Sequence, residues 1–508
     1  MYEGNENQIL QPHEFFLPFA GELDAKNRWC RMALYIPWAE MEQQYLKKLL
    51  GLGRGRKALS VRMALGSVLI AQQEGYTDEA FLEAVMENPY MQYFLGLSGF
   101  KQEPLFDPSL MVYFRRRLSG EPLARISEMV AISEAKRRME EKAEKERKRE
   151  ERTARRRKDP PDDGTAGSSP DDTGAVRTEQ MHLDNMGEMI LDATCIPADI
   201  HFPTDIRLLH EAREWTERCI DKLHAPDRGK VRRPRTYREK ACQVYLNMSK
   251  SKKLTIKVLR KGIRKQLQYL ARNLRIIDAY EAQGRHDLLS KSEQERLSVC
   301  RLVLAQQQAH YDTGKSPPQR IVSLHMPFVR PIKRGKAGAD TEFGLKLAVS
   351  LVEGMVFIEK ASFENFNEGV TLIESVERYR ERFGYYPRAV LADQLYRNRD
   401  NLDYCKKHNI HLSGKPLGRP KKDPALKRLM KTLLRIDAGM RNAVEGKFGE
   451  AKRCYGLDRV FAKTTSSFLA KVYAACVCMN LQSILRFLFW LFQRGFLHAF
   501  YRSGCFVP

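Results

Sequence analysis

Paired cysteines are missing from this sequence. Its ten cysteines are scattered, and no two of them form a C-x-x-C motif. Zinc fingers and disulfide scaffolds need cysteines at set spacings, so neither is indicated, and we expect reduced thiols in the cytoplasm. His201 and His210, with Asp205 and Glu211 nearby, also fit no zinc-binding spacing. We interpret these two histidines as residues of a helix surface.

A hydrophobic run long enough to cross a membrane is missing as well. The first residues are polar and acidic, so no signal peptide is expected. The most apolar region begins near Phe468, but Asn480 and Gln482 interrupt it. Its last run, Phe487 to Phe492, falls far short of the ~20 residues that a span needs. We interpret this region as a pair of helices that is buried or faces a partner.

Acidic residues are too few to balance the basic ones. The chain of 508 residues contains 87 lysines and arginines against 63 acidic residues, a net charge of +24. This excess favours a polyanionic partner but does not separate DNA from RNA or an anionic membrane. The length allows roughly two to four domains, each large enough to bury a core.

The first 180 residues divide into two parts. Residues 1–130 have mostly helical apolar spacing, which predicts an all-helical domain for DNA binding or dimerisation. One of its helices ends in Arg115, Arg116 and Arg117, which are candidate phosphate contacts or simply a solvated helix end. Residues 131–180 are predicted to be a charged, disordered linker: the first part is charged on every face and could form only a lone helix with no apolar stripe to bury, and the second part is rich in Asp, Gly, Ser and Pro.

Residues 181–460 show alternating strand and helix patterns. A buried strand is predicted to end near Asp192, a β-hairpin to turn at Glu353-Gly354, and a second buried strand to end at Asp393. Residues of about 205–315 form a helical insertion between the first two strands, and residues 461–508 form C-terminal hydrophobic helices. The order predicts a mixed α+β fold of the α/β class, with a mixed sheet flanked by helices.

Three carboxylates stand out in this pattern. Asp192 and Asp393 lie at strand ends, and Glu445 lies on a later helix, within the stretch RNAVEGKFGEAKR. On a helix, Arg441 and Lys452 share one face with Glu445 because they lie four and seven residues away. Three carboxylates from three segments can hold two metal ions for phosphodiester chemistry. Turn or cap aspartates and a salt-bridged helix surface would leave the same pattern.

The order Asp192, Asp393 and the Glu445 helix resembles the DDE transposases of bacterial insertion sequences, within the insertion-sequence-five-like group. That family's helix reads Tyr, two residues, Arg, three residues, Glu, six residues, Lys, and Arg441, Glu445 and Lys452 match its last three terms. Ala438 stands where the family has the tyrosine. Further segments extend the resemblance over about four fifths of the chain, among them LPFAGELDAKNRWCRMALYIPW, LDATCIPADIHFPTDIRLLHEAREWTERCID and VLADQLYRNRDNLDYCKKHNIHLSGKPLGRP.

The resemblance implies an RNase H-like catalytic domain in which the three acids bind two Mg²⁺ or Mn²⁺ ions. It implies cleavage at terminal inverted repeats and strand transfer into target DNA, by a homodimer or higher oligomer in the bacterial cytoplasm, near the nucleoid. Double-stranded DNA would be the partner of the residues flanking the acids and of a basic loop. These are Arg441, Lys452, Tyr396, Arg397, Lys415, Arg419, Lys421 and Lys422.

Two other functions stay open at this point. A domesticated or decayed copy would bind and assemble on DNA without cutting it, and a stand-alone RNase H-like nuclease would use the same acids on RNA–DNA hybrids. The intact set of three acids argues against decay. The helical N-terminal region and the long insertion favour paired DNA ends over a simple hybrid.

Overall fold

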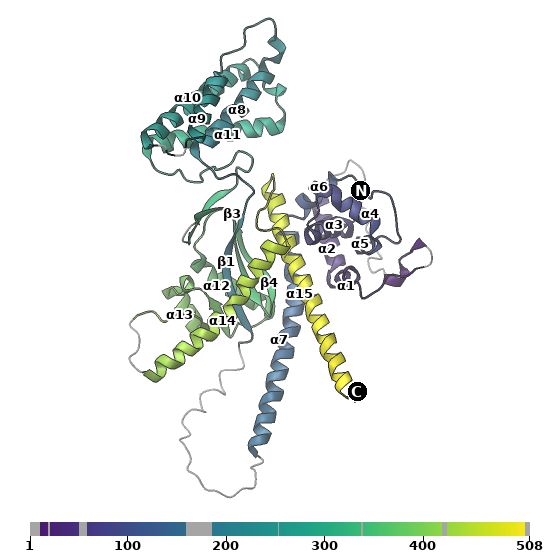
Figure 1. Cartoon of the computed structure of the whole chain (residues 1–508). Coiled ribbons are helices and arrows are strands. Elements are labelled where there is room, and N and C mark those ends of the chain that lie inside the picture. The colour runs from purple at the N-terminus through teal and green to yellow at the C-terminus, as the bar shows by residue number, and fades with distance from the viewer. Residues whose placement is uncertain are drawn as a thin grey trace.

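The computed structural model describes residues 11–18, 21–49, 58–158, 185–251, 253, 255–336, 339–418 and 424–502. A mixed sheet lies at the centre, with a group of helices from the N-terminal region beside it and a second group at one end (Figure 1). Two long helices, α7 and α15, run from the centre in the same direction (Figure 1).

The N-terminal region is helical, in agreement with its apolar spacing. Gly75, in the left-handed region at φ 72°, ends one helix, and the Thr77 hydroxyl caps the next by accepting from the Ala80 amide at 3.2 Å. The helices are α1 (Arg28–Tyr35), α2 (Trp38–Leu49), α3 (Val61–Glu74), α4 (Asp78–Glu87), α5 (Pro89–Phe94) and α6 (Leu110–Leu118).

Helix α7 (Glu121–Lys158) replaces the first part of the expected linker. The expectation of disorder from residue 131 is wrong as far as 158, because the apolar stripe does not stop at 130. Ala131, Ala135 and Met139 are buried, and the helix packs against α15 and strand β4. These three residues continue the helical spacing of the buried Leu123 and Ile126. One apolar face therefore holds the first half of α7 against the rest of the protein. The rest of the expected linker, residues 159–180, lies outside the described residues.

The sheet contains β1 (Glu188–Pro197), β2 (Arg330–Lys336), β3 (Ala339–Val352), β4 (Met355–Ser362), β5 (Ala389–Ala392) and β6 (His411–Leu412). Its order is β2-β3-β1-β5-β6, with β4 also paired to β3. The β1–β3, β2–β3 and β3–β4 pairs are antiparallel, whereas β1–β5 and β5–β6 are parallel. The chain therefore forms a mixed sheet, as its sequence pattern predicts.

The predicted hairpin between β3 and β4 turns at Glu353 and Gly354. Both residues have positive φ, 48° and 80°, the backbone of a tight two-residue turn that matches strand twist. The first strand differs from expectation, because β1 continues five residues past Asp192 to Pro197. It does so because β3 remains paired to it as far as Pro197 and keeps those residues extended.

Helices α12 (Leu372–Phe383), α13 (Arg399–Lys407) and α14 (Pro424–Cys454) follow the hairpin, and α14 crosses the sheet at β1 and β5. The expected pair of C-terminal helices is instead one helix, α15 (Thr465–Arg502). By length and composition, its segment Thr465–Phe487 could cross a membrane, but 72% of the most apolar 18-residue stretch in it is buried inside the protein. We assign this segment to the core.

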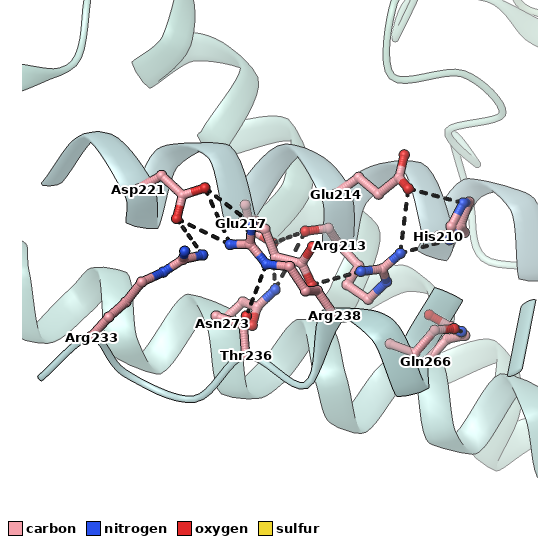
Figure 2. A network of polar contacts seen from close by, with 12 residues as sticks. His210, Arg213, Glu214, Glu217, Asp221, Arg233, Thr236, Arg238, Gln266 and Asn273 are labelled. Atoms are coloured by element: carbon pink, nitrogen blue, oxygen red, sulfur yellow. Dashed lines mark hydrogen bonds and ion pairs between the residues drawn. The ribbon is translucent and has the colours of Figure 1, made fainter. Parts of the chain in front are cut away.

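Between β1 and β2, the described residues form four α-helices: α8 (Asp205–His224), α9 (Arg238–Ser249), α10 (Ile256–Glu281) and α11 (Lys291–Thr313). They have a hydrophobic core of their own, separate from the core that the sheet shares with the N-terminal helices and α15. A polar network also runs along α8 (Figure 2). In it the buried Arg213 donates to Glu217 at 2.6 Å and contacts His210 at 2.9 Å.

Candidate active site

Asp192 lies where β1 loses its neighbour on one edge. Strand β5 pairs only with Glu188–Leu191, so from Asp192 onward this edge of β1 is open. The half-buried carboxylate accepts a hydrogen bond from the Ala193 amide at 2.8 Å. Burial, supported by the charges of Glu368 and Asp393, raises the pKa of Asp192 to about 6 although that hydrogen bond and Arg441 oppose the shift.

Asp393 follows directly after β5, beside Asp192 on the neighbouring strand. One of its carboxylate oxygens accepts from the Gln394 amide at 2.7 Å and from the Arg441 guanidinium at 2.9 Å. Burial raises its pKa, but these two donors outweigh burial and hold the pKa of Asp393 below its usual value. Asp393 therefore carries a negative charge that one arginine of α14 partly neutralises.

Glu445 approaches the two aspartates from α14. Its neighbour Val444 is fully buried and anchors the helix on the sheet, while the Glu445 side chain is exposed. The helical periodicity read from the sequence therefore holds here. Arg441, Glu445 and Lys452 all line the same cleft.

The three acids share one cleft of about 710 Å³ at the open edge of β1. Its donors are carboxylate oxygens, the ligands that Mg²⁺ and Mn²⁺ prefer. Among the described residues, no three acidic, histidine or cysteine side chains are grouped closely enough to hold an ion as they stand. The residue types thus fit a divalent ion, and the Arg441–Asp393 ion pair occupies one of the expected ligands.

Sequence reasoning missed two residues of this cleft, Lys346 on β3 and Glu368 after β4. Lys346 is only 8% exposed, and its Nζ lies 2.9 Å from a Glu368 carboxylate oxygen and 2.7 Å from the Phe366 carbonyl oxygen. Because lysine is almost never buried without a partner, a lysine within the apolar run GLKLAVSL was the available signal.

Tyr396 and Arg397 do not lie where a DNA contact requires them. The Tyr396 side chain is completely buried beneath the cleft, which corrects the expectation that it touches DNA. Arg397 donates to the carbonyl oxygens of Leu412 at 2.5 Å and Ser413 at 3.1 Å. Its guanidinium therefore holds the end of β6 in place instead of facing solvent.

The remaining cations predicted to contact DNA are spread over two regions. Arg115 forms a two-point ion pair with Asp78, at 2.7 and 2.6 Å, and Arg117 donates to the Tyr45 hydroxyl at 3.3 Å. Arg116 is exposed, as is Lys415 in the loop after β6. The other predicted members of that loop, Arg419, Lys421 and Lys422, lie outside the described residues.

Two parts of the chain match known families. Residues 390–482, which include Asp393 and Glu445, match a family described as a transposase DDE domain. Residues 19–117, which include the three consecutive arginines, match a family described as a transposase domain.

One curated relative also shares sequence with the chain. It is named "Uncharacterized protein ORF8 in nfe locus", from Rhizobium meliloti, and is 32% identical over 111 residues. The match covers 21% of this chain and 52% of the relative, so the chain spans about half the length of this protein. No solved structure matches the chain.

Proposed function

Because this chain belongs to the DDE transposases of bacterial insertion sequences, we propose that it binds the terminal inverted repeats of a mobile element. It then cuts the DNA there and joins the freed end to target DNA. A homodimer, or a larger homo-oligomer, would hold the two ends. The basic excess of the chain, +24 in net charge, supports a polyanionic partner.

One observation carries this proposal: Asp192, Asp393 and Glu445 come from β1, the end of β5 and α14, and line a single cleft. Two strands and a helix anchored in the core are rigid supports, as a catalytic constellation requires. Antiparallel pairing of β4 with β3 and of β3 with β1, followed by parallel pairing of β1 with β5 and of β5 with β6, supports an RNase H-like assignment, with β2 as an additional strand on β3.

Asp192, Asp393 and Glu445 would hold two Mg²⁺ or Mn²⁺ ions. When bound, such ions lower the pKa of a water molecule and neutralise charge on the attacking and leaving oxygens of the phosphate. Lys452, which lines the cleft beside Glu445, would contact the DNA backbone. Arg441 would do the same once Asp393 exchanges its present arginine partner for an ion.

The same cleft would also serve a stand-alone nuclease, and an inactive copy would keep its fold. The second matched domain, over residues 19–117, favours a transposase over a nuclease that acts on hybrids alone. A cleavage assay distinguishes these candidates, because an inactive copy cuts no DNA and, of the two enzymes, only the transposase requires the element's own ends.

The test is cleavage of DNA that carries the inverted repeats flanking the gene, with Mg²⁺, by the full chain and by Glu445→Gln. We expect the variant to cut at least ~100-fold more slowly, because loss of a metal ligand removes several kcal/mol of charge stabilisation. DNA binding should change less than about twofold, since the substitution removes a negative charge and no phosphate contact.

Glu450→Gln is the matched control, because Glu450 lies on the same helix but pairs with Lys447 and Arg486 away from the cleft. It should cut like the unmodified protein. Undiminished cutting by Glu445→Gln would contradict the proposed site. Binding to the repeats without any cutting by the unmodified protein would support the inactive copy, and equal cutting of a hybrid would support the nuclease.

A further inference from the structure

A second cavity, here called the junction pocket, lies where the helical insertion meets the end of the sheet. Its volume is about 510 Å³. It is lined by the segment after β1, by α8 and α11, by the segment before β2 and by the segment after α14. The residues used below are Asp199, Trp215, Arg218, Arg296, Arg459 and Phe461.

Trp215 lines this pocket, and two arginines stack on its ring. The guanidinium carbons of Arg296 and Arg218 lie 4.4 and 4.9 Å from the centroid of the indole ring. Two cations on one ring repel each other, and neither has an ion-pair partner among the described residues. An anion placed between them would relieve that repulsion.

The acidic residues of the pocket do not supply this anion, because each already has a cationic partner. Asp199 pairs with Arg459 at 2.5 Å, Glu211 with Arg207 at 2.9 Å, and Glu214 with Arg213 at 3.6 Å. The positive charge of Arg218 and Arg296 is therefore left for a ligand.

An exposed aromatic ring lines the pocket together with these cations. Phe461 is 55% exposed. Burying this ring against the flat face of a ligand would be favourable. Aromatic rings interleaved with arginines in a groove are the usual surface for an unpaired nucleic-acid strand, since bases stack on the rings and phosphates meet the cations.

The junction pocket also begins just beyond the end of β1, the strand that lines the catalytic cleft. Cys195 lines the cleft and Asp199 lines the pocket, four residues further along the chain. The segment after α14 joins the two sites as well, since the Asp199 amide donates to the Val460 carbonyl oxygen at 2.8 Å. Four extended residues span roughly 13 Å, so a strand that leaves the cleft would reach the pocket over a short distance.

We propose that the junction pocket binds an unpaired DNA strand that leaves the catalytic cleft, with a base on Phe461 and its phosphates on Arg218 and Arg296, beside Trp215. This site rests on the proposed function, because it takes the strand that cutting frees. A pocket of this volume accommodates one or two nucleotides of a single strand but not a duplex.

The test measures the anisotropy of a fluorescein-labelled 20-nucleotide oligo-dT and of a duplex of equal length, bound to the full chain without divalent ions. The double variant Arg218→Ala with Phe461→Ala changes two partly exposed side chains. It should bind the single strand at least ~10-fold more weakly, because one stacking ring and one phosphate contact are lost. Duplex affinity should change less than about twofold.

Arg275→Ala is the matched control, an exposed arginine of the same insertion on α10 and outside the pocket. It should leave both affinities unchanged. In a second measurement, oligo-dT should quench tryptophan fluorescence in the unmodified protein and much less in Trp215→Phe, which keeps an aromatic ring at this position.

Three outcomes would overturn the inference: unchanged single-strand affinity in the double variant, an equal loss for single strand and duplex, or equal displacement of oligo-dT by polyglutamate. None of these measurements involves cutting. A protein that cleaves its repeats but fails them would keep the proposed function and lose only the pocket. A protein that passes them but does not cleave would lose the proposed function instead.

Discussion

Asp192 lies at the open edge of β1, and the fold disfavours the charged form of its carboxyl group. Its pKa is raised to about 6 from 3.8, chiefly by burial. For an acid whose folded-state pKa is raised, the destabilisation is complete above that pKa and disappears as the pH falls towards the unfolded value. The folded protein therefore tolerates a destabilising charge at neutral pH in the place where a metal ion would compensate it.

Asp192→Asn should accordingly stabilise the fold at pH 8, by about 1–3 kcal/mol, since the amide removes the charge but keeps the shape. The gain should shrink steadily between pH 6 and pH 4, where Asp192 itself becomes protonated. Thermal unfolding in a chelating buffer at several pH values measures this difference. The same gain at pH 4.5 and pH 8 would mean that the charge of Asp192 is not its cause.

The candidate site shows how far single residues can be read from a sequence. Asp192, Asp393 and Glu445 could be singled out from expected strand ends, helical spacing and the family resemblance, although β1 in fact runs past Asp192 and the catalytic role of the three acids remains a prediction. Lys346 and Glu368 could not, because their pairing depends on β3 and the segment after β4 coming together across the sheet. Tyr396 was misplaced since nothing in its local sequence reveals that its ring is buried.

Among the elements, the apolar helix α15 contains Asn480 because this side chain forms hydrogen bonds with the neighbouring strand β4. This side chain is buried and pairs with the edge strand β4, accepting from the Val356 amide at 2.8 Å and donating to the Val356 carbonyl oxygen at 2.9 Å. It thus satisfies two backbone groups that an edge strand would otherwise leave without partners. The interruption that argued against a membrane span from sequence is, in the fold, a contact between helix and sheet.

Asn480→Leu should destabilise the protein by about 2–4 kcal/mol, because a similar volume stays filled while a buried amide and carbonyl lose their hydrogen bonds. Gln482→Leu, a half-buried change on the same helix, should alter the stability by less than about 1 kcal/mol. Urea unfolding of both variants gives the comparison. Equal effects would show that the Asn480 contact with β4 contributes little.

The elements themselves were predictable where the pattern is local. The hairpin at Glu353-Gly354 follows from two β-branched and apolar arms around a turn, and it is present. The length of α7 could not be predicted from the sequence, because its apolar residues are outnumbered by charged ones. These apolar residues are buried by contact with α15, more than 300 residues later in the chain. The length of β1 beyond Asp192 likewise depends on β3, a distant strand.

The described residues form two hydrophobic cores, and one of them joins regions that the sequence pattern assigns to separate domains. One core joins the N-terminal helices, α7, the sheet and α15, so the matched N-terminal and DDE regions are packed together. The other core belongs to the insertion alone and includes Leu270, Leu274 and Ile277 of α10. Cooperative unfolding follows shared cores, so the insertion should open independently of the rest.

Leu270 and Leu65 offer a matched test, since both are fully buried leucines, one in each core. Leu270→Ala should cost about 2–5 kcal/mol locally and speed amide hydrogen exchange in α8, α10 and α11 while the sheet stays protected. Leu65→Ala, on α3, should speed exchange in both the N-terminal helices and the strands, because they share its core. If Leu270→Ala sped amide exchange in the sheet as much as in the insertion, the two cores would form one cooperative unit. The junction pocket would then lie inside that unit instead of at the boundary between two parts that open independently.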